Sequence, residues 1–161
     1  MQTIKPSVQV WQDPVYFVAF GFGTGLLPIA PGTWGTLAAI PLYLLISTYS
    51  LPIYLLFTFL FFLLGVYVSD KVGKDLGIHD YSGIVWDEVV GYLLTMAGLP
   101  LGIFWMLGGF ILFRLFDILK PFPISFIDKK IKGGLGVMLD DVLAAIPAWL
   151  ILKSLAWVFS L

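Results

Sequence analysis

The segment IYLLFTFLFFLLGVYVS, residues 53–69, contains no charged side chain and is followed at once by Asp70 and Lys71. Further apolar runs occur at residues 37–49, 89–99, 103–116 and 142–159. A helix that spans a bilayer needs about 20 apolar residues, and several runs fall short of this unless their flanks are also helical. We therefore expect an all-α fold, a polytopic membrane helical bundle with about four to five transmembrane or re-entrant helices.

The composition of the whole chain supports a membrane location. Hydrophobic residues make up 60% of the sequence and charged residues 12%, with a mean hydropathy of +0.98. Soluble domains average about 25% charged residues. The 161 residues are enough for a single domain, residues 1–161, of which 1–14 form a polar N-terminal segment without the apolar core of a signal peptide.

Charge and cysteine content exclude several classes of function. The net charge of −1 gives no basic surface for nucleic acid, and the absence of cysteine excludes disulfides, thiol nucleophiles and thiolate metal ligands. The serine and threonine residues have no nearby paired base, so a serine-type triad has no support. Chemistry must come from oxygen ligands, from the lone His79 and from Arg and Lys, with membrane lipids as the expected partners.

The distribution of basic residues predicts an orientation. The short connections near residues 50–52 and 100–102 carry no charge, whereas the longer connections 70–86 and 120–139 are charged. Seven lysines fall on the charged side, namely Lys5, Lys71, Lys74, Lys120, Lys129, Lys130 and Lys132. By the positive-inside rule this side is cytoplasmic. Lys153 is expected to extend toward the opposite interface. Five tryptophans near span ends are expected to anchor the bundle there: Trp11, Trp34, Trp86, Trp105 and Trp157.

Compact acidic groups border the apolar runs. They are His79–Asp80, Asp87–Glu88, Asp117 and Asp140–Asp141. Carboxylates are costly beside hydrocarbon and usually mark function. If a helix begins near Val85, Asp87 and Glu88 lie in its first turn, where they can bind a metal or simply stabilise the helix dipole. Asp140 alone is compatible with an ordinary N-cap of the last span, but the adjacent Asp141 needs another partner, such as a hard cation.

Two further groups are candidates for binding phosphate, each with a structural alternative. Arg114 and Asp117 are three residues apart and can pair on one helix face, yet Arg114 can also hold a phosphoryl oxygen. Lys120 suits a helix C-terminus. The segment GTWGT, residues 32–36, opens the first span after a glycine-rich stretch, residues 15–29, that we expect to be interfacial or re-entrant. Its helix N-terminus can bind an anion, or its glycines can serve close packing with Thr36 as a cap.

These groups supply hard oxygen ligands, cationic side chains and backbone N–H groups that can bind phosphate, all at one membrane face. Mg²⁺ suits them because it binds carboxylates, waters and phosphate oxygens. Such a site can activate water for attack on a phosphate monoester, and a carboxylate nucleophile is the alternative. His79, the only imidazole, can transfer a proton, support a neighbouring ligand or hold its loop.

Four blocks carry a resemblance to a known family. They read GFGTGLLPIAPGTWGT at residues 21–36, GIHDYSGIVWDEVVG at 77–91, FRLFDILKPFPI at 113–124 and GGLGVMLDDVLA at 133–144. In this order they resemble the phosphatidylglycerophosphatase A family of bacterial membrane enzymes. The resemblance implies a Mg²⁺-dependent phosphatase that converts phosphatidylglycerophosphate to phosphatidylglycerol in phospholipid biosynthesis. It also implies a multi-pass enzyme of the bacterial cytoplasmic (inner) membrane.

The residues and the resemblance together predict which side chains form the site. The candidate catalytic residues are Asp80, Asp87, Glu88, Asp141 and His79. The candidate metal ligands are Asp80, Asp87, Glu88, Asp117, Asp140 and Asp141. The candidate phosphate-binding residues are Arg114, Lys120, Thr33, Gly35 and Thr36. The alternative, a small transporter or accessory subunit with a structural cation site, predicts acids along a path through the midplane, which the apolar runs almost entirely lack.

Overall fold

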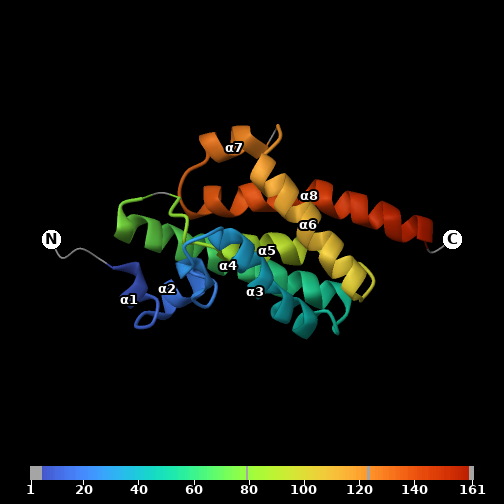
Figure 1. Ribbon diagram of the computed structural model, residues 1–161, viewed down its shortest axis with the longest axis horizontal. Helices are drawn as coiled ribbons and strands as arrows, with labels where there is room; N and C mark the ends of the chain where they lie inside the picture. Colours follow the sequence, from blue (N-terminus) through green and yellow to red (C-terminus); the bar gives the residue numbers. More distant parts are fainter. Residues whose placement is uncertain (1–4, 79, 123, 160–161) are drawn as a thin grey trace.

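The computed structural model describes residues 5–78, 80–122 and 124–159, and every regular element in these ranges is helical. The elements, drawn in Figure 1, are α1 (Pro6–Gln9), α2 (Pro14–Ala19), the 3₁₀ helix η1 (Thr24–Leu26), α3 (Pro31–Ile46), α4 (Leu51–Leu76), α5 (Trp86–Thr95), α6 (Ile103–Leu119), α7 (Ile124–Lys130) and α8 (Gly134–Phe159). The expectation of an all-α bundle is confirmed.

The short helix α5 lies at the centre of this bundle. It packs against α3, α4, α6 and α8, and most of its residues are buried (Figure 1). Its 10 residues rise about 15 Å, half of the about 30 Å hydrocarbon thickness of a bilayer. The apolar run at residues 89–99 therefore lies mainly in a short enclosed helix, which ends at Thr95, and the longer helices around it carry the bundle across the membrane.

The outer surface of the long helices is apolar. Among the described residues, α4 and α8 are the helices long and apolar enough to cross a membrane, and α3 is a shorter apolar helix. Each long helix has 26 residues, which corresponds to about 39 Å. Only 22% of the most apolar window of each is buried inside the protein. Such an outward-facing apolar surface fits hydrocarbon rather than water, so this is a polytopic membrane bundle.

Helix α4 extends beyond its apolar run. It continues to Leu76, so the first part of the connection expected at residues 70–86 is helical. Gly77 ends the helix with a left-handed φ of +67°. Its N–H donates to the Lys74 carbonyl at 3.2 Å, and the Ile78 N–H donates to the Gly73 carbonyl at 3.1 Å. This pair of bonds is the Schellman arrangement, in which glycine is preferred because it adopts positive φ without strain.

Helix α8 begins eight residues before the run expected at 142–159. Its first residue is Gly134, within the connection that we expected at residues 120–139. A Cβ at Gly134 would overlap the Val66 carbonyl oxygen, so glycine is needed where α8 crosses α4. The expectation that Asp140 and Asp141 open the last span is wrong. Both lie in the second turn of α8, where Asp140 is no N-cap.

The N-terminal segment packs against α4. The Asp13 side chain caps α2 by accepting the Val15 N–H at 2.8 Å. Lys71 on α4 places its Nζ 2.9 Å from Asp75 Oδ2 and 3.8 Å from Asp13 Oδ2. Tyr16 is buried in the small apolar cluster beneath them. The glycine-rich stretch at residues 15–29 thus forms short helical pieces held on the bundle.

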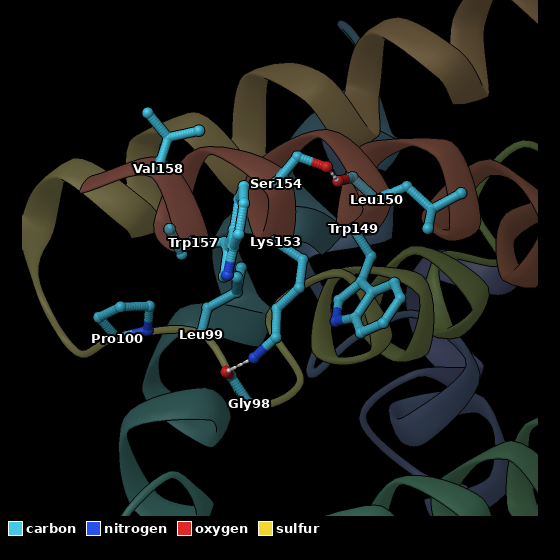
Figure 2. A pocket seen from close by; sticks show the side chains of 10 residues that line it. Gly98, Leu99, Pro100, Trp149, Leu150, Lys153, Ser154, Trp157 and Val158 are labelled. Carbon is cyan, nitrogen blue, oxygen red and sulfur yellow. Dashed lines mark hydrogen bonds between the residues drawn. The ribbon is translucent and has the colours of Figure 1, made fainter. Parts of the chain in front are cut away.

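One end of the bundle collects the charges. It consists of the C-terminal turns of α4 and α6 and the N-terminal turns of α5 and α8, and we call it the charged end. The opposite end carries the uncharged turns and a groove of about 930 Å³ beside Trp149 and Trp157. There the Lys153 Nζ donates to the Gly98 carbonyl at 2.7 Å (Figure 2). Lys153 therefore lies at the end where we expected it.

The expected role of Trp86 is wrong. Trp11, Trp34 and Trp157 are exposed, as anchoring residues should be, but Trp86 is buried in the core. Its Nε1 donates to the Phe61 carbonyl at 2.9 Å. Buried indole N–H groups usually find such an acceptor, which explains how tryptophan begins an enclosed helix.

Candidate active site

Asp87 and Glu88 lie in the first turn of α5, as predicted from a helix start near Val85. The helix begins at Trp86, and no side chain caps its N-terminus. The backbone N–H groups there favour negative charge, so both acids stabilise the helix end. Capping does not account for their burial, because Asp87 is 8% exposed and the Glu88 side chain 13%. Carboxylates in such positions need partners.

Asp141 reaches these acids because α5 and α8 approach closely. A Cβ at Gly91 would lie 3.2 Å from the Asp141 Cβ and 2.5 Å from the Phe113 ring. Glycine at this position, one turn beyond Asp87, lets Asp141 come alongside. As a result, one carboxylate oxygen each from Asp87, Glu88 and Asp141 lie within 4.8 Å of one another. Among the described residues these three form the group with the spacing of a metal site.

Each of the three carboxylates has one oxygen that lacks a hydrogen-bond partner. Asp87 Oδ1, Glu88 Oε2 and Asp141 Oδ2 are each buried without a hydrogen-bond partner. Burial raises the pKa of Asp87 well above its usual 3.8, and neighbouring carboxylates raise it further. Burial likewise raises the pKa of Glu88 from its usual 4.5 to about 7. The cluster therefore favours either a proton or a cation.

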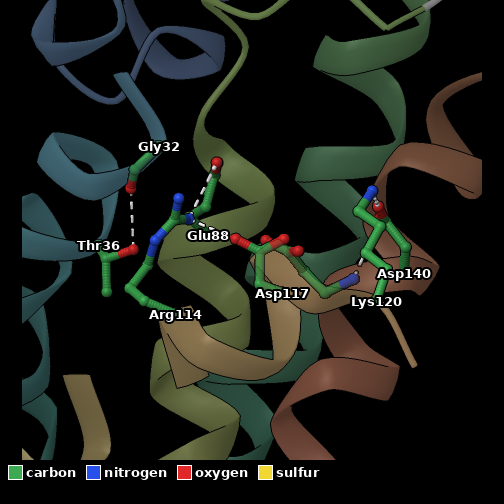
Figure 3. Close-up of polar contacts among 8 residues, drawn as sticks. Gly32, Thr36, Glu88, Arg114, Asp117, Lys120 and Asp140 are labelled. Carbon is green, nitrogen blue, oxygen red and sulfur yellow. Dashed lines mark hydrogen bonds and ion pairs between the residues drawn. The ribbon is translucent and has the colours of Figure 1, made fainter. Parts of the chain in front are cut away.

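Arg114 of α6 approaches the cluster from the side. Its Nη1 lies 2.5 Å from Asp117 Oδ2 and 3.5 Å from Glu88 Oε1 (Figure 3). The predicted pairing of Arg114 with Asp117 on one helix face is thus present. The Arg114 Nε is buried and has no acceptor. One guanidinium therefore holds two carboxylates and keeps a buried donor that a phosphate oxygen could accept from.

Lys120 and Asp140 form a second ion pair at the end of α6. The Lys120 Nζ contacts Asp140 Oδ2 (Figure 3). Asp140 Oδ1 accepts the backbone N–H of Asp141 at 3.1 Å. Asp117 and Asp140, which we predicted as metal ligands, thus each face a cation of α6 and lie outside the group of three described above.

The N-terminal turn of α3 forms the back of the site. A Cβ at Gly32 would overlap Glu88 Oε1 and lie 2.9 Å from Arg114 Nη1. The Thr36 hydroxyl donates to the Gly32 carbonyl at 2.9 Å (Figure 3), so Thr36 does not cap the helix as the structural alternative proposed. Gly35 lies against Val85, and Thr33 is partly buried. These contacts favour close packing for Gly35 and Thr36, and they place Gly32 nearest the carboxylates.

Asp80 and His79 are the remaining candidates. Asp80 is exposed in the connection before α5 and is not among the three clustered acids. His79 lies outside the described residues. Gly32 and Gly91 also shape the site, and neither was predicted as a site residue. For Gly91 the sequence did contain a signal, because this glycine stands one helical turn after Asp87.

The fold and this cluster define a helical membrane protein with a buried, carboxylate-rich site at one end of its bundle. The chain belongs to the phosphatidylglycerophosphatase A family, whose model matches residues 17–156. The resemblance noted in the sequence is thereby confirmed, and the protein is an enzyme of the phosphatase class.

Individual relatives cover most of the chain. A phosphatidylglycerophosphatase A of Haemophilus influenzae is 48% identical over 147 residues, 90% of both chains. A phosphatidylglycerophosphatase A of Escherichia coli is 42% identical over 83% of this chain and 78% of its own. A putative phosphatidylinositol-3-phosphatase of Bacteroides thetaiotaomicron is 36% identical over 88% of this chain and 92% of its own. No solved structure matches the chain.

Proposed function

We propose that this enzyme hydrolyses the terminal phosphate monoester of phosphatidylglycerophosphate, gives phosphatidylglycerol and requires Mg²⁺. Two relatives at 42% and 48% identity carry the name of this activity. The observation that carries the proposal here is the group of three buried carboxylates from α5 and α8, each with an unpartnered oxygen.

The donor set fits a hard divalent cation. Mg²⁺ is bound through a few carboxylates and otherwise by water and substrate phosphate oxygens. Asp87, Glu88 and Asp141 would hold it, and their three buried oxygens would gain the partner that they lack. When bound, the ion supplies positive charge that stabilises the phosphoryl group and lowers the pKa of water.

Arg114 is proposed to bind the phosphate. Its Nη1 lies 3.5 Å from Glu88 Oε1, so the guanidinium borders the carboxylate group, and its buried Nε has no acceptor within the described protein. A guanidinium binds tetrahedral oxyanions through two parallel N–H bonds, which fixes orientation as well as charge. The N-terminal turn of α3, in contact with both Arg114 and Glu88, would add the partial positive charge of a helix N-terminus.

The charged end is proposed to face the cytoplasm of a bacterial cell. Several lysines of the chain, including Lys71, Lys74 and Lys120, fall at this end, and the opposite turns carry none. The positive-inside rule then orients the bundle in the inner membrane. In this orientation the site meets a lipid headgroup at the cytoplasmic leaflet while the acyl chains stay in the bilayer.

A second substrate class has a specific observation behind it. The Bacteroides relative is named a putative phosphatidylinositol-3-phosphatase. Both lipids present a phosphate monoester on a hydroxylated headgroup, so the carboxylates and Arg114 could serve either. Within the phosphatase class, the two substrates therefore differ in the headgroup that the site must select.

The test is phosphate release by the purified enzyme in detergent micelles, with Mg²⁺ or with EDTA. Phosphatidylglycerophosphate should release phosphate only with the cation, and faster than phosphatidylinositol 3-phosphate. Asp87→Asn should abolish release, whereas Asp75→Asn, which alters an exposed ion pair on α4, should not. Equal release with EDTA would remove the Mg²⁺ requirement, and a preference for the inositol lipid would reassign the substrate.

A further inference from the structure

Lys120 occupies an unusual backbone position at the end of α6. It has φ +40° and ψ +57°, the left-handed conformation that non-glycine residues adopt rarely and at a cost. Its N–H donates to the Phe116 carbonyl at 2.9 Å and closes the helix. A lysine at a position where glycine would be free of strain indicates that its side chain has a specific task.

The side chain of Lys120 reaches α8 and pairs with Asp140, which is 6% exposed. The other oxygen of Asp140 accepts the N–H of Asp141. The Asp140 carboxylate therefore already contacts a cation on one oxygen and a backbone donor on the other. Asp141, by contrast, has a buried oxygen without a partner.

Helix α6 thus contacts both helices that supply the carboxylate group. Arg114 pairs with Glu88 on α5, and Lys120 pairs with Asp140 on α8, six residues further along α6. An ion pair of this kind at each helix fixes the separation between the acids of α5 and Asp141 on α8. Buried pairs contribute specificity of position even where they add little net stability.

We infer that Lys120 and Asp140 form a positioning clamp that sets Asp141 against Asp87 and Glu88, and that Asp140 is not itself a metal ligand. The inference rests on the proposed function, because it assigns roles within the same site. It also gives Lys120 a partner in the protein rather than the substrate phosphate. The two possible roles of Asp140 can be told apart. If Asp140 positions Asp141, metal binding depends on Lys120 as well, whereas if Asp140 is itself a ligand, metal binding does not need Lys120.

The experiment measures Mn²⁺ binding to the purified enzyme by the loss of the free-ion paramagnetic resonance signal, together with phosphate release. The variants are Lys120→Met, Asp140→Asn, the two combined, and the exchange of both charges in Lys120→Asp with Asp140→Lys. Lys74→Met is the matched control, because it removes the exposed Lys74–Asp70 pair on α4. Circular dichroism and elution volume report folding of each variant.

Each single variant should weaken Mn²⁺ binding by about 10- to 100-fold, as loss of a group that orients a metal ligand does. The double variant should be no weaker than either single one, because both remove the same pair. The charge exchange should recover most of the binding, and Lys74→Met should match the parent.

Two results would overturn the clamp. In one, Lys120→Met binds Mn²⁺ like the parent while Asp140→Asn does not. In the other, the folded charge exchange binds as poorly as Asp140→Asn, because a lysine at position 140 cannot replace a ligand. The proposed function stands in either case if the parent binds Mn²⁺ and releases phosphate. A parent that does neither would remove the proposed function and the clamp together.

Discussion

Gly32 lies so close to Glu88 that a Cβ at residue 32 would overlap the Glu88 Oε1 atom. The first turn of α3 therefore determines where this carboxylate can be. It also limits Arg114, whose Nη1 would be 2.9 Å from the same Cβ. A backbone position thus fixes two charged side chains of different helices, and this contact links the packing of α3 to the chemistry of the site.

Gly32→Ala should impair catalysis more than folding. The added methyl must displace Glu88 or Arg114, and misplacement of a reacting group by about 1 Å can cost up to 100-fold in rate. We expect phosphate release to fall by about 10- to 100-fold. Gly108→Ala is the matched control on α6, where the new Cβ would meet only the Leu152 side chain at 3.2 Å. Equal rates for Gly32→Ala and the control would contradict this account of Gly32.

Arg114→Lys should separate the contribution of the positive charge at residue 114 from that of the planar guanidinium geometry. Lysine keeps the positive charge beside Asp117 and Glu88 but loses the planar fork and the buried Nε donor. We expect KM for the lipid substrate to rise by about tenfold or more, because one charge-assisted hydrogen bond to the phosphate is lost. The Mn²⁺ affinity should stay close to the parent value. Steady-state kinetics with excess Mg²⁺ checks this. A KM equal to that of the parent would exclude Arg114 from phosphate binding.

Mg²⁺ should raise the thermal stability of the parent enzyme. Binding to the folded state alone stabilises by about 2.7 kcal/mol at 100 times Kd, and each kcal/mol moves Tm by about 2 to 4 °C for a chain of this size. Asp141→Asn should lose the response. In EDTA this variant should melt higher than the parent, because one of three crowded buried charges is gone. Thermal unfolding in detergent measures both. A Mg²⁺ response that survives in Asp141→Asn would place the cation elsewhere.

The stability of the cation-free enzyme should depend on pH. The pKa of Glu88 is about 7 in the folded state against the usual 4.5. Between these values the folded state holds a proton that the unfolded chain has released, so the free energy of unfolding decreases as pH rises from 4.5 to about 7. Unfolding in EDTA across this range should show the decrease, and Glu88→Gln should make it smaller, because the raised pKa of Asp87 and the buried carboxylate of Asp141 still contribute. An unchanged slope in Glu88→Gln would contradict the assignment to this group.

The sequence predicted the helical bundle and part of the site for clear physical reasons. Long apolar runs require helices in hydrocarbon. The acids of the α5 first turn were placed correctly because Asp87 and Glu88 follow the helix start directly. The start of α8 was missed because the glycines before Asp140 are typical of a loop. Gly134 is instead needed where α8 crosses α4, a tertiary contact that no local pattern contains.

The division of the acids could not be predicted either. The Arg114–Asp117 pair follows from their spacing within α6 and was predicted. In sequence, however, Asp140 and Asp141 are equivalent acidic residues beside the last apolar run. Which of them pairs with a cation depends on the rotation of α6 and α8 about their axes, which brings Lys120 to Asp140 and leaves Asp141 facing Asp87 and Glu88.

The central claim is that carboxylates from α5 and α8 hold one hard cation between them. Anomalous X-ray scattering from crystals grown with Mn²⁺ tests it most directly. The account predicts an anomalous peak within bonding distance of Asp87, Glu88 and Asp141, and no such peak in Asp141→Asn. A peak bound only by other residues, or an empty group of three at saturating Mn²⁺, would contradict it.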